Sequence, residues 1–457
     1  MLCAAALTDL TALFGARLST ANAVLQQHAQ GESHIKASAP WAVVFPETTE
    51  EVARLGALSA RYGFPLIGWG AGTSLEGQAL ATQGGVTVDF TRMDRVLSVS
   101  PEDMLCVVQP GITRERLNEE LRATGLFFPV DPGANASIGG MAATRASGTA
   151  AVRYGTMRNN VLGLEVVLAD GGVIRTGTSA PKSAAGYDLT ALMVGSEGTL
   201  GLITELTLRL TGQPEAVSSA TCAFPSITEA VDCVIATIQT GIPMARIEFL
   251  DEMTVAACNA FSGTQLPLRA HLLVEFHGSP AGVAEQAERF GEIAAQFGSE
   301  AFQWASARED RSRLWKMRHD AYRAILASRP GCTALVTDLC VPISALAEAV
   351  EETRADIAAS PLPGPILGHV GDGNFHAILL INEGDATESE AAKALATRMA
   401  ERALRLGGTI TGEHGIGFGK RQLMAAEHGA AWQVMGTVKL ALDPDNRMNP
   451  GKLVPSL

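Results

Sequence analysis

Three loops built mostly from small residues lie in the first half of the chain, and they constrain its fold most strongly. An apolar run leads into residues 65–77, where glycine stands at every second place from Gly68 to Gly72. Residues 128–142 have few large side chains, and residues 195–204 form a third such turn before a β-like run. Glycine lets backbone N–H groups turn inward and approach a phosphate closely. Three such loops in one domain predict a long, flat ligand that carries phosphate.

The pattern around these loops predicts a mixed domain of helices and strands. Short apolar runs at 41–45, 85–89 and 164–168 are typical of strands, and residues 48–62 and 113–124 are typical of helices. After residue 213 the pattern predicts a second α+β domain. Its expected helices are 226–240, 281–297, 307–327 and 343–358, and its expected strands are 270–276, 334–341 and 375–381. The turn-rich residues after 408 are too few to fold alone, so they must pack on another domain.

Composition and charge exclude some classes of partner. The 457 residues are 47% hydrophobic, and 35 basic against 48 acidic residues give a formal charge of -13. Because no dense Lys/Arg stripe interrupts this balance, nucleic acid is not an expected partner. The seven cysteines form no CxxC pair, so we expect no disulfide framework. Asp9 precedes the first cation, Arg17, and no apolar run reaches the roughly 18 to 20 residues of a membrane span, so we expect neither signal peptide nor transmembrane segment.

A nicotinamide dinucleotide site is one alternative for the first glycine loop. Asp89 ends an expected strand about 20 residues after Gly68, where a dinucleotide fingerprint has its ribose-binding acid. However, Thr73 stands at the third glycine position of that fingerprint, and the next residues do not begin an amphipathic helix. The loop therefore favours another anionic cofactor, with a plain tight turn as the remaining alternative.

A predicted hairpin in the second half carries two histidines. Asp372 and Gly373 stand between two apolar runs, which predicts a two-residue β-turn. With these two residues in the turn, His369 is expected directly opposite His376, with Cβ atoms about 5 Å apart. Two imidazoles at this spacing can bind one divalent ion.

A glycine turn at residues 411–417 offers the missing negative ligand. Glu413 and His414 are adjacent there, and in an irregular turn both side chains can enter one pocket. Two histidines and one carboxylate leave positions open for substrate, as a catalytic zinc or manganese site requires. A zinc hydrolase whose glycine loops bind a phosphate-containing substrate is therefore an alternative of a different class. The other histidines are expected to be structural: His28, His34, His271, His277, His319 and His428.

The glycine loops resemble those of flavoproteins with the vanillyl-alcohol oxidase / p-cresol methylhydroxylase fold. The resemblance spans residues 40–455 and continues in the branch that includes FAD-linked D-lactate dehydrogenases, the FAD subunit of glycolate oxidase and D-2-hydroxyglutarate dehydrogenases. Segments 329–332 and 337–344 look most like the D-lactate dehydrogenases.

This resemblance implies an α+β protein of three parts. Residues 1–213 are expected to form a two-subdomain FAD-binding domain of the vanillyl-alcohol oxidase type. Residues 214–408 are expected to form an α+β substrate (cap) domain with an antiparallel sheet that carries the metal hairpin. Residues 409–457 are expected to return to the FAD domain and complete the active site.

The resemblance also implies a set of FAD-binding residues. They are Gly68, Trp69, Gly70, Ala71, Gly72, Thr73, Ser74, Pro132, Gly133, Ser137, Ile138, Gly139, Gly140, Gly148, Glu197, Gly198, Ile203 and Asn449. Some relatives tether FAD through a histidine in the first loop. This chain has none there, so non-covalent FAD is expected.

Roles for the polar residues of the second half follow from the same resemblance. The matches to metal ligands are His369, His376 and Glu413, and the match to the general base is His414. Arg318 matches an arginine that binds the substrate carboxylate, and a guanidinium offers that group a two-pronged bond. Asn374 is expected to be an extra donor at the hairpin tip. Val336 replaces a lysine of the 2-hydroxyglutarate enzymes, so a second carboxylate would be held less well.

The expected activity is oxidation of a D-2-hydroxy acid, with D-lactate to pyruvate foremost, by metal-assisted hydride transfer to flavin N5. A glycolate oxidase FAD subunit and a D-2-hydroxyglutarate dehydrogenase are the alternatives within the family. The expected partners are a small 2-hydroxy acid and an external electron acceptor, which is a quinone, a cytochrome or an electron-transfer flavoprotein. We expect a cytoplasmic protein, with peripheral contact at the inner face of the membrane left open.

Overall fold

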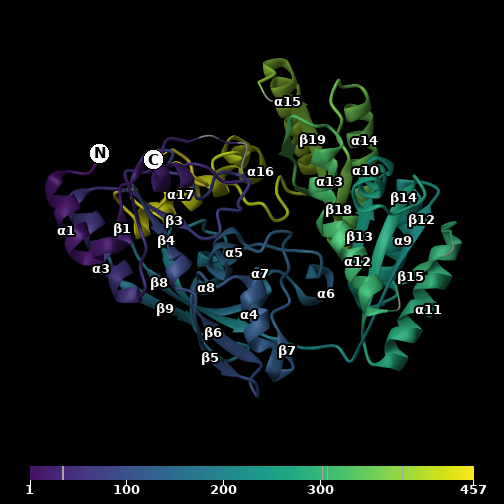
Figure 1. Cartoon of the computed structure of the whole chain (residues 1–457), viewed down its shortest axis with the longest axis horizontal. Helices are drawn as coiled ribbons and strands as arrows, with labels where there is room; N and C mark the ends of the chain where they lie inside the picture. Colours follow the sequence, from purple (N-terminus) through teal and green to yellow (C-terminus); the bar gives the residue numbers. More distant parts are fainter. Residues whose placement is uncertain (33–34, 36, 301, 306, 383, 457) are drawn as a thin grey trace. The chain divides into compact units, whose positions relative to one another are not determined.

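The computed structural model describes residues 1–32, 35, 37–300, 302–305, 307–382 and 384–456 (Figure 1). They form two compact units. Unit 1 comprises Met1–Ser147, Gly155–Gln213 and Glu413–Leu457, and unit 2 comprises Gly148–Tyr154 and Pro214–Gly412. Each unit is described by itself below.

Unit 1 begins with a small, mostly parallel sheet in the order β1-β2-β4-β3. Its strands are β1 (Leu18–Ser19), β2 (Ala42–Val44), β3 (Leu66–Trp69) and β4 (Val86–Asp89). Helices α1 (Ala4–Phe14), α2 (Asn22–Gln27) and α3 (Thr49–Tyr62) accompany it. Helix α3 begins where the Thr48 hydroxyl accepts from the Glu51 N–H, and it ends at Gly63 in the left-handed conformation.

The second sheet of unit 1 is antiparallel, in the order β5-β6-β10-β8-β9. Its strands are β5 (Val96–Ser100), β6 (Leu105–Val108), β8 (Val161–Val167), β9 (Val173–Gly177) and β10 (Leu202–Arg209), with β7 (Leu126–Phe127) and β11 (Thr211–Gly212) paired separately. The helices are α4 (Arg114–Leu121), α5 (Ile138–Thr144), α7 (Met157–Asn160) and α8 (Leu189–Met193). Alternate residues of the central strand β10, such as Leu206 and Leu208, lie in the apolar core.

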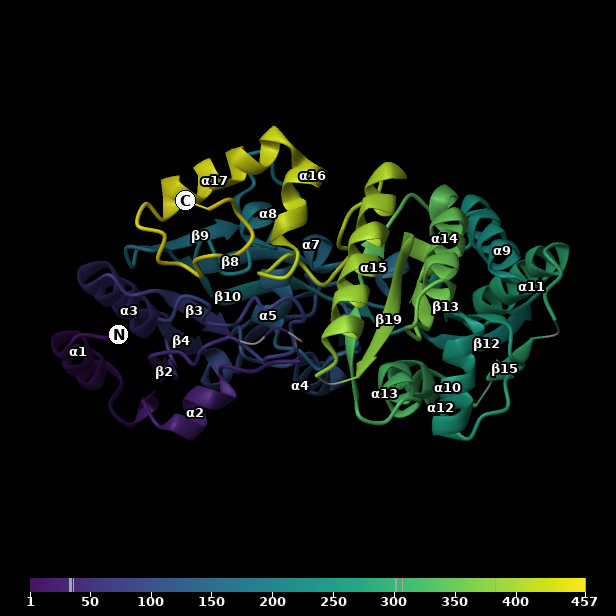
Figure 2. The same cartoon turned by 90° about the horizontal axis from the view of Figure 1, so that it is seen from above.

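The C-terminal residues of unit 1 bind to the free side of β3. The N–H of Leu66 donates to the Arg447 carbonyl, and the N–H of Asn449 donates to the Leu66 carbonyl, so this segment pairs with β3. Before it lie α16 (Met424–His428) and α17 (Ala430–Leu442). Buried Lys439 of α17 donates to the carbonyl oxygens of Thr199 and Met448, which attaches the helix to the same unit. Figure 2 shows α16 and α17 in yellow.

Unit 2 is built on an eight-stranded antiparallel sheet in the order β15-β12-β14-β13-β18-β19-β16, with β17 also paired to β19. The strands are β12 (Ala216–Phe224), β13 (Met244–Leu250), β14 (Ala270–Gly278), β15 (Gln303–Ala305), β16 (Cys332–Val336), β17 (Leu339–Cys340), β18 (Ile366–His369) and β19 (Asn374–Asn382). The short helix α6 (Ala151–Tyr154) joins this unit through bonds from Arg153 to the Pro243 carbonyl and between Tyr154 and His277.

Helices cover both faces of this sheet, as Figure 2 shows. On one side lie α9 (Ile227–Gln239), α11 (Pro280–Gln296), α14 (Leu346–Ala358) and α15 (Ala386–Arg405). On the other lie α10 (Glu252–Ser262), α12 (Arg308–His319) and α13 (Ala321–Ala327). Because strand side chains alternate, Phe276 packs on Phe290 of α11 while Leu273 joins the cluster with Trp315 of α12.

Two elements expected from the sequence are divided in the structure. The expected helix 307–327 is two helices, since α12 ends at His319 and α13 starts at Ala321. The expected strand 334–341 is interrupted after Val336. The Thr337 hydroxyl there accepts from the Ala377 N–H, and pairing with β19 resumes at Leu339. The interruption places Asp338 in the interior, where it is fully buried.

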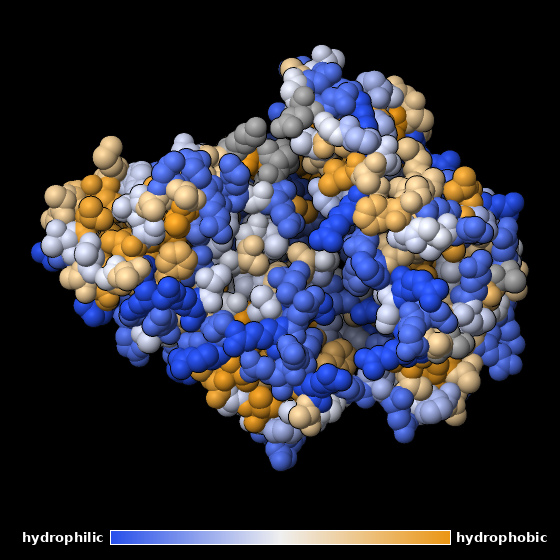
Figure 3. All heavy atoms as spheres, viewed as in Figure 1, coloured by the Kyte–Doolittle hydropathy of each residue, from blue (hydrophilic) through white to orange (hydrophobic). Residues whose placement is uncertain are grey.

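The helices among the described residues include none that is both long and apolar enough to cross a membrane. On the face shown in Figure 3, apolar side chains lie in patches separated by hydrophilic ones.

Leu206 provides a test of the unit 1 core. It is 0% exposed on the central strand β10, so Leu206→Ala should lower the free energy of unfolding by about 2–5 kcal/mol. Leu97 in the same sheet is 43% exposed, so Leu97→Ala should change the free energy of unfolding by no more than about 0.5 kcal/mol. Urea unfolding of both variants measures the difference, and equal losses would contradict this assignment of the core.

Candidate active site

The first glycine loop follows β3 and presents a row of backbone donors. Within the described part of the chain, the N–H groups of residues 71–75 donate to no protein acceptor. Gly72 has a φ of +72°, and a Cβ there would lie 2.6 Å from the Trp69 ring. Successive N–H groups in a tight turn form a concave site for an anion. The loop is therefore suited to bind a phosphate group through its backbone.

The second glycine loop lies directly against the first. A Cβ on Gly70 would lie 2.1 Å from the Ser137 hydroxyl oxygen, so only glycine permits this approach. Ser137 caps α5 by accepting from the Gly140 N–H, and a Cβ on Gly139 would strike Pro110 at 2.4 Å. The two loops thus form one narrow backbone surface within unit 1.

The third loop reaches the C-terminal residues of the same unit. Glu197 has a φ of +55°, and its carbonyl accepts from the Asn449 amide at 2.7 Å. The same Asn449 nitrogen donates to the Gln78 carbonyl at 2.9 Å. Asn449 therefore joins the loop that follows β3 to the loop that precedes β10.

The Glu197 carboxylate binds a neighbouring turn of unit 1. It accepts from the N–H groups of Ile416 at 2.7 Å and Gly417 at 2.8 Å. Gln78 adds a bond from its side-chain nitrogen to the His414 carbonyl, at 2.7 Å. Although these amides favour the ionised form, burial raises the pKa of Glu197 to about 7. Glu197 thus holds the turn that carries Glu413 and His414, whatever its backbone contributes to cofactor binding.

Lys452 is the cation of this buried network. Its ammonium donates to the carbonyls of Gln78 and Leu80 and to the Asn449 side-chain oxygen, at 3.1, 2.7 and 2.6 Å. Burial lowers the pKa of Lys452 to about 7, against the attraction of Glu197.

In unit 2, the hairpin register differs from the sequence-based prediction. His369 pairs with Asn374 rather than with His376, because the turn contains four residues, 370–373, instead of two. The expected direct pairing of the histidines is therefore wrong. The shift equals two residues, so both side chains stay on one face. Their ring centroids are 5.5 Å apart with an interplanar angle of 82°, as diagonal neighbours.

Each histidine has a fixed tautomer. The Nδ1 of His369 lies 2.7 Å from Glu248 Oε1, and the Nδ1 of His376 lies 3.0 Å from the Thr337 carbonyl. A carbonyl and an ionised carboxylate only accept, so the proton lies on Nδ1 in both rings. The lone pair is then on Nε2, the atom that such an arrangement presents to a metal.

Arg318 of α12 shares an acid with His369. Its Nε and Nη2 lie 2.9 and 2.6 Å from Glu248 Oε2. Glu248 is 0% exposed on β13, and Arg318 is also buried. One carboxylate of the sheet thus contacts both the predicted substrate-binding arginine and a predicted metal ligand.

Asn374 is held by a second buried acid. Its side-chain nitrogen donates to Asp338 Oδ1 at 2.8 Å and to the Leu339 carbonyl at 2.9 Å. With both amide hydrogens used in this way, Asn374 can offer its carbonyl oxygen to a substrate hydroxyl. The structure therefore favours an acceptor where the sequence suggested a donor.

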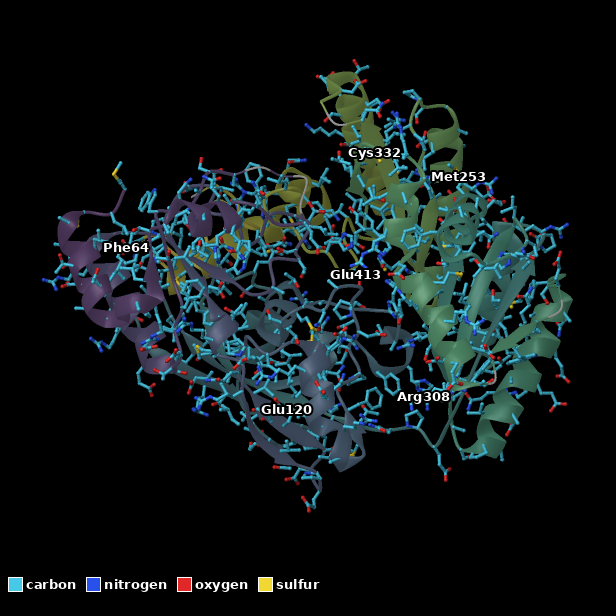
Figure 4. All side chains as sticks on the ribbon, viewed as in Figure 1. Phe64, Glu120, Met253, Arg308, Cys332 and Glu413 are labelled. Carbon is cyan, nitrogen blue, oxygen red and sulfur yellow. The ribbon has the colours of Figure 1, made fainter. Side chains whose placement is uncertain are left out.

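The same acid fixes the end of unit 2. Asp338 Oδ2 accepts from the Thr411 hydroxyl at 2.6 Å, and a Cβ on Gly412 would lie 2.2 Å from the Asn374 amide nitrogen. Glu413 follows Gly412 directly and is the first residue of the next stretch of unit 1 (labelled in Figure 4).

The predicted residues thus fall into two groups. Unit 2 brings together His369, His376, Arg318 and Asn374 and also includes Gly148, whereas unit 1 contains the other predicted FAD contacts with Glu413 and His414. Sequence reasoning missed Glu248, Gln78 and Lys452, and it gave Asp338 no role. His277, expected to be structural, bonds Tyr154 and Glu275, and His34 lies outside the described residues.

Comparison with known proteins identifies the family. Residues 213–453 match the model "FAD linked oxidases, C-terminal domain", and residues 40–177 match "FAD binding domain". The chain belongs to the FAD-linked oxidases. This FAD-linked oxidase is similar to a probable mitochondrial D-lactate dehydrogenase of Danio rerio, with 51% identity over 96% of this chain and 89% of the relative. It is 45% identical to a mitochondrial D-lactate dehydrogenase [cytochrome] of Arabidopsis thaliana, over 93% of this chain and 75% of the relative.

Solved structures agree with the predicted fold of this FAD-linked oxidase. p-Cresol methylhydroxylase matches with a TM-score of 0.76 at 16% identity, covering 99% of this chain and 96% of that one. The expected α+β architecture with an FAD-binding domain of the vanillyl-alcohol oxidase type is confirmed. The adjoining glycine loops, with their row of N–H donors, fit the phosphates of FAD.

The expected cytoplasmic location of this FAD-linked oxidase is wrong by the same comparison. The relatives at 51% and 45% identity are both named mitochondrial enzymes. The prediction had rested on the N-terminal residues and on the absence of long apolar runs, and neither feature identifies a compartment.

The raised pKa of Glu197 predicts a pH dependence of stability. Between its ordinary value of 4.5 and about 7, the folded state binds more protons than the unfolded state. The contribution of Glu197 to the free energy of unfolding is fully present below about pH 4.5. It falls by about 3 kcal/mol as the pH rises through about 7. Lys452 is protonated in both states over the lower part of this window, but burial lowers its pKa to about 7, so it begins to titrate in the folded state at the upper end. There the unfolded state binds the additional proton, and the contribution of Lys452 opposes that of Glu197.

Glu197→Gln removes this titration. Denaturant unfolding across the window should show that the wild-type free energy of unfolding falls with rising pH more steeply than that of Glu197→Gln. Glu205→Gln, which alters a partly exposed carboxylate paired with Arg175, should keep the wild-type slope. Parallel curves for wild type and Glu197→Gln would refute the assignment.

Proposed function

We propose that this FAD-linked oxidase oxidises D-2-hydroxy acids, with D-lactate to pyruvate as its main reaction. The names of the relatives at 51% and 45% identity support the substrate. The observation in the structure that carries the proposal is the pair formed by Arg318 and His369 on one buried carboxylate, Glu248. This arrangement sets an anion-binding guanidinium beside an imidazole with its lone pair on Nε2.

A divalent metal, zinc or manganese, is the second part of the proposal. His369 and His376 would supply two nitrogen ligands, and Glu413 would supply the carboxylate. The neutral tautomers fixed by Glu248 and by the Thr337 carbonyl support this donor set. The metal would acidify the 2-hydroxyl of a bound hydroxy acid.

The remaining chemistry is divided between the cofactor and the protein. FAD, held without a covalent link, would supply the acceptor for the hydride of the substrate C2. Arg318 orients the substrate carboxylate through charge-assisted hydrogen bonds. His414 accepts the proton of the 2-hydroxyl as general base, and Asn374 offers the substrate a further polar contact. The Gln78 and Glu197 bonds to the 414–417 backbone hold that base in place.

The two electrons then leave to an external acceptor, for which we propose a cytochrome. The word "cytochrome" in the name of the Arabidopsis thaliana relative supports this choice. Reduction of a cytochrome by the substrate-reduced protein would support it, whereas transfer to quinones alone would contradict it.

Anaerobic bleaching of the bound flavin tests substrate and metal together. D-lactate should bleach the yellow protein faster than L-lactate, glycolate or D-2-hydroxyglutarate, because Val336 offers no cation for a second carboxylate. Chelation should abolish bleaching, and manganese or zinc should restore it.

A colourless protein that cannot take up FAD would instead favour the hydrolase alternative. Bleaching that continues in the presence of the chelator would exclude a role for the metal in the reaction.

His414→Ala tests the general base. The variant should retain bound flavin, while turnover should fall by about 10²–10⁴-fold because the substrate proton loses its acceptor. His428→Ala, which changes a partly exposed histidine of α16, should leave turnover unchanged. Steady-state kinetics with an artificial dye acceptor measures both, and near-normal turnover of His414→Ala would exclude it as the base.

A further inference from the structure

Glu248 lies in the middle of a buried sheet face and is itself completely buried. It belongs to β13, whose neighbour β18 pairs Phe249 with Gly368, so continuation of the register sets Glu248 beside His369. Removing a carboxylate from water costs several kcal/mol unless partners compensate. An acid at this position therefore has to be explained by its contacts.

Both carboxylate oxygens are used. Oε2 accepts from Nε and Nη2 of Arg318, and Oε1 accepts from Nδ1 of His369. Because the guanidinium binds edge-on through two nitrogens, its orientation is fixed. Within the described part of the chain, Nη1 of Arg318 has no protein acceptor, so its two hydrogens can serve a substrate carboxylate.

Helix α12 is attached to the sheet by a separate acid. The Trp315 indole nitrogen donates to Glu275 Oε2 at 2.5 Å, and the Ser219 hydroxyl donates to the same atom at 2.7 Å. Trp315 and Arg318 are three residues apart and share one helix face. Since Glu275 and the apolar cluster around Trp315 hold the helix, Glu248 is not needed to attach it.

We propose that Glu248 is a positioning residue that couples the metal ligand His369 to the substrate-binding Arg318. The inference rests on the proposed function. Glu248 holds the proton on Nδ1 of His369, which keeps the Nε2 lone pair directed to the metal. The same carboxylate fixes the guanidinium, so the substrate carboxylate and the metal are bound at a set spacing.

Glu248→Gln is the central test, because it keeps the side-chain length and removes one accepting oxygen. The amide has one accepting oxygen and an NH2 group in place of the second, so it cannot hold Arg318 and His369 in their wild-type positions together, and we expect both contacts to weaken. Affinity of the flavin-loaded protein for Mn²⁺, measured by titration calorimetry, should fall about 10–100-fold. KM for D-lactate should rise at saturating Mn²⁺, while flavin content stays at the wild-type level.

Glu388→Gln is the matched control. Glu388 is also a glutamate of unit 2 that binds an arginine, Arg329, at 2.7 Å, and it lies outside the proposed site. This variant should keep wild-type Mn²⁺ affinity and KM. Should Glu248→Gln fail to fold, Glu248→Asp retains the charge with a shorter reach, and the same two losses are expected from it.

The outcomes separate this inference from the proposed function. A wild-type protein that binds no Mn²⁺, or whose flavin D-lactate does not reduce, contradicts the proposed function. A functional wild type together with a folded Glu248 variant of unchanged Mn²⁺ affinity and KM overturns the role of Glu248. Loss of only one of the two affinities overturns the coupling.

Discussion

The cost of burying charge governs this structure. Glu197, Glu248 and Asp338 are each nearly or fully removed from solvent, and each has both carboxylate oxygens engaged. Removing the partners of a buried acid would lower the free energy of unfolding by several kcal/mol. These contacts therefore define where the neighbouring segments must lie. In all three cases those segments carry residues of the predicted reaction. The site is therefore ordered by the same interactions that make its interior charges tolerable.

The sheet of unit 2 adds the second constraint, which is the two-residue period of β-strands. Glu248, His369 and His376 come from three neighbouring strands and still share one face, since each strand alternates its side chains. Helix α12 packs on that face through Trp315 and Met317, and its Arg318 binds Glu248. Rigid strands, rather than loops, thus hold the imidazoles and the acid, which suits a site that needs small tolerances.

Local pattern was enough to predict most helices and strands, and the family resemblance gave the architecture. Local pattern also predicted that both histidines lie on one face of the hairpin. The predicted turn was two residues too short, but a shift of two residues keeps a side chain on the same face. What local pattern could not give were partners distant in sequence. Glu248 lies 121 residues from His369, and Glu197 lies 219 residues from Ile416. Asp338 was hidden for another reason, since the interruption between β16 and β17 looks like one continuous strand in the sequence.

The chain leaves and re-enters unit 1, so this unit is assembled from three separated stretches. On a ribosome, the nascent chain would have all of unit 2 available once Gly412 has emerged. The edge of β3 would still lack the segment around Met448, and Glu197 would lack Ile416 and Gly417. Unit 1 could then be completed only after nearly the last residues are released, with unit 2 already formed. Truncation of the C-terminal residues would consequently disrupt unit 1, although most of that unit comes from the N-terminal half of the chain.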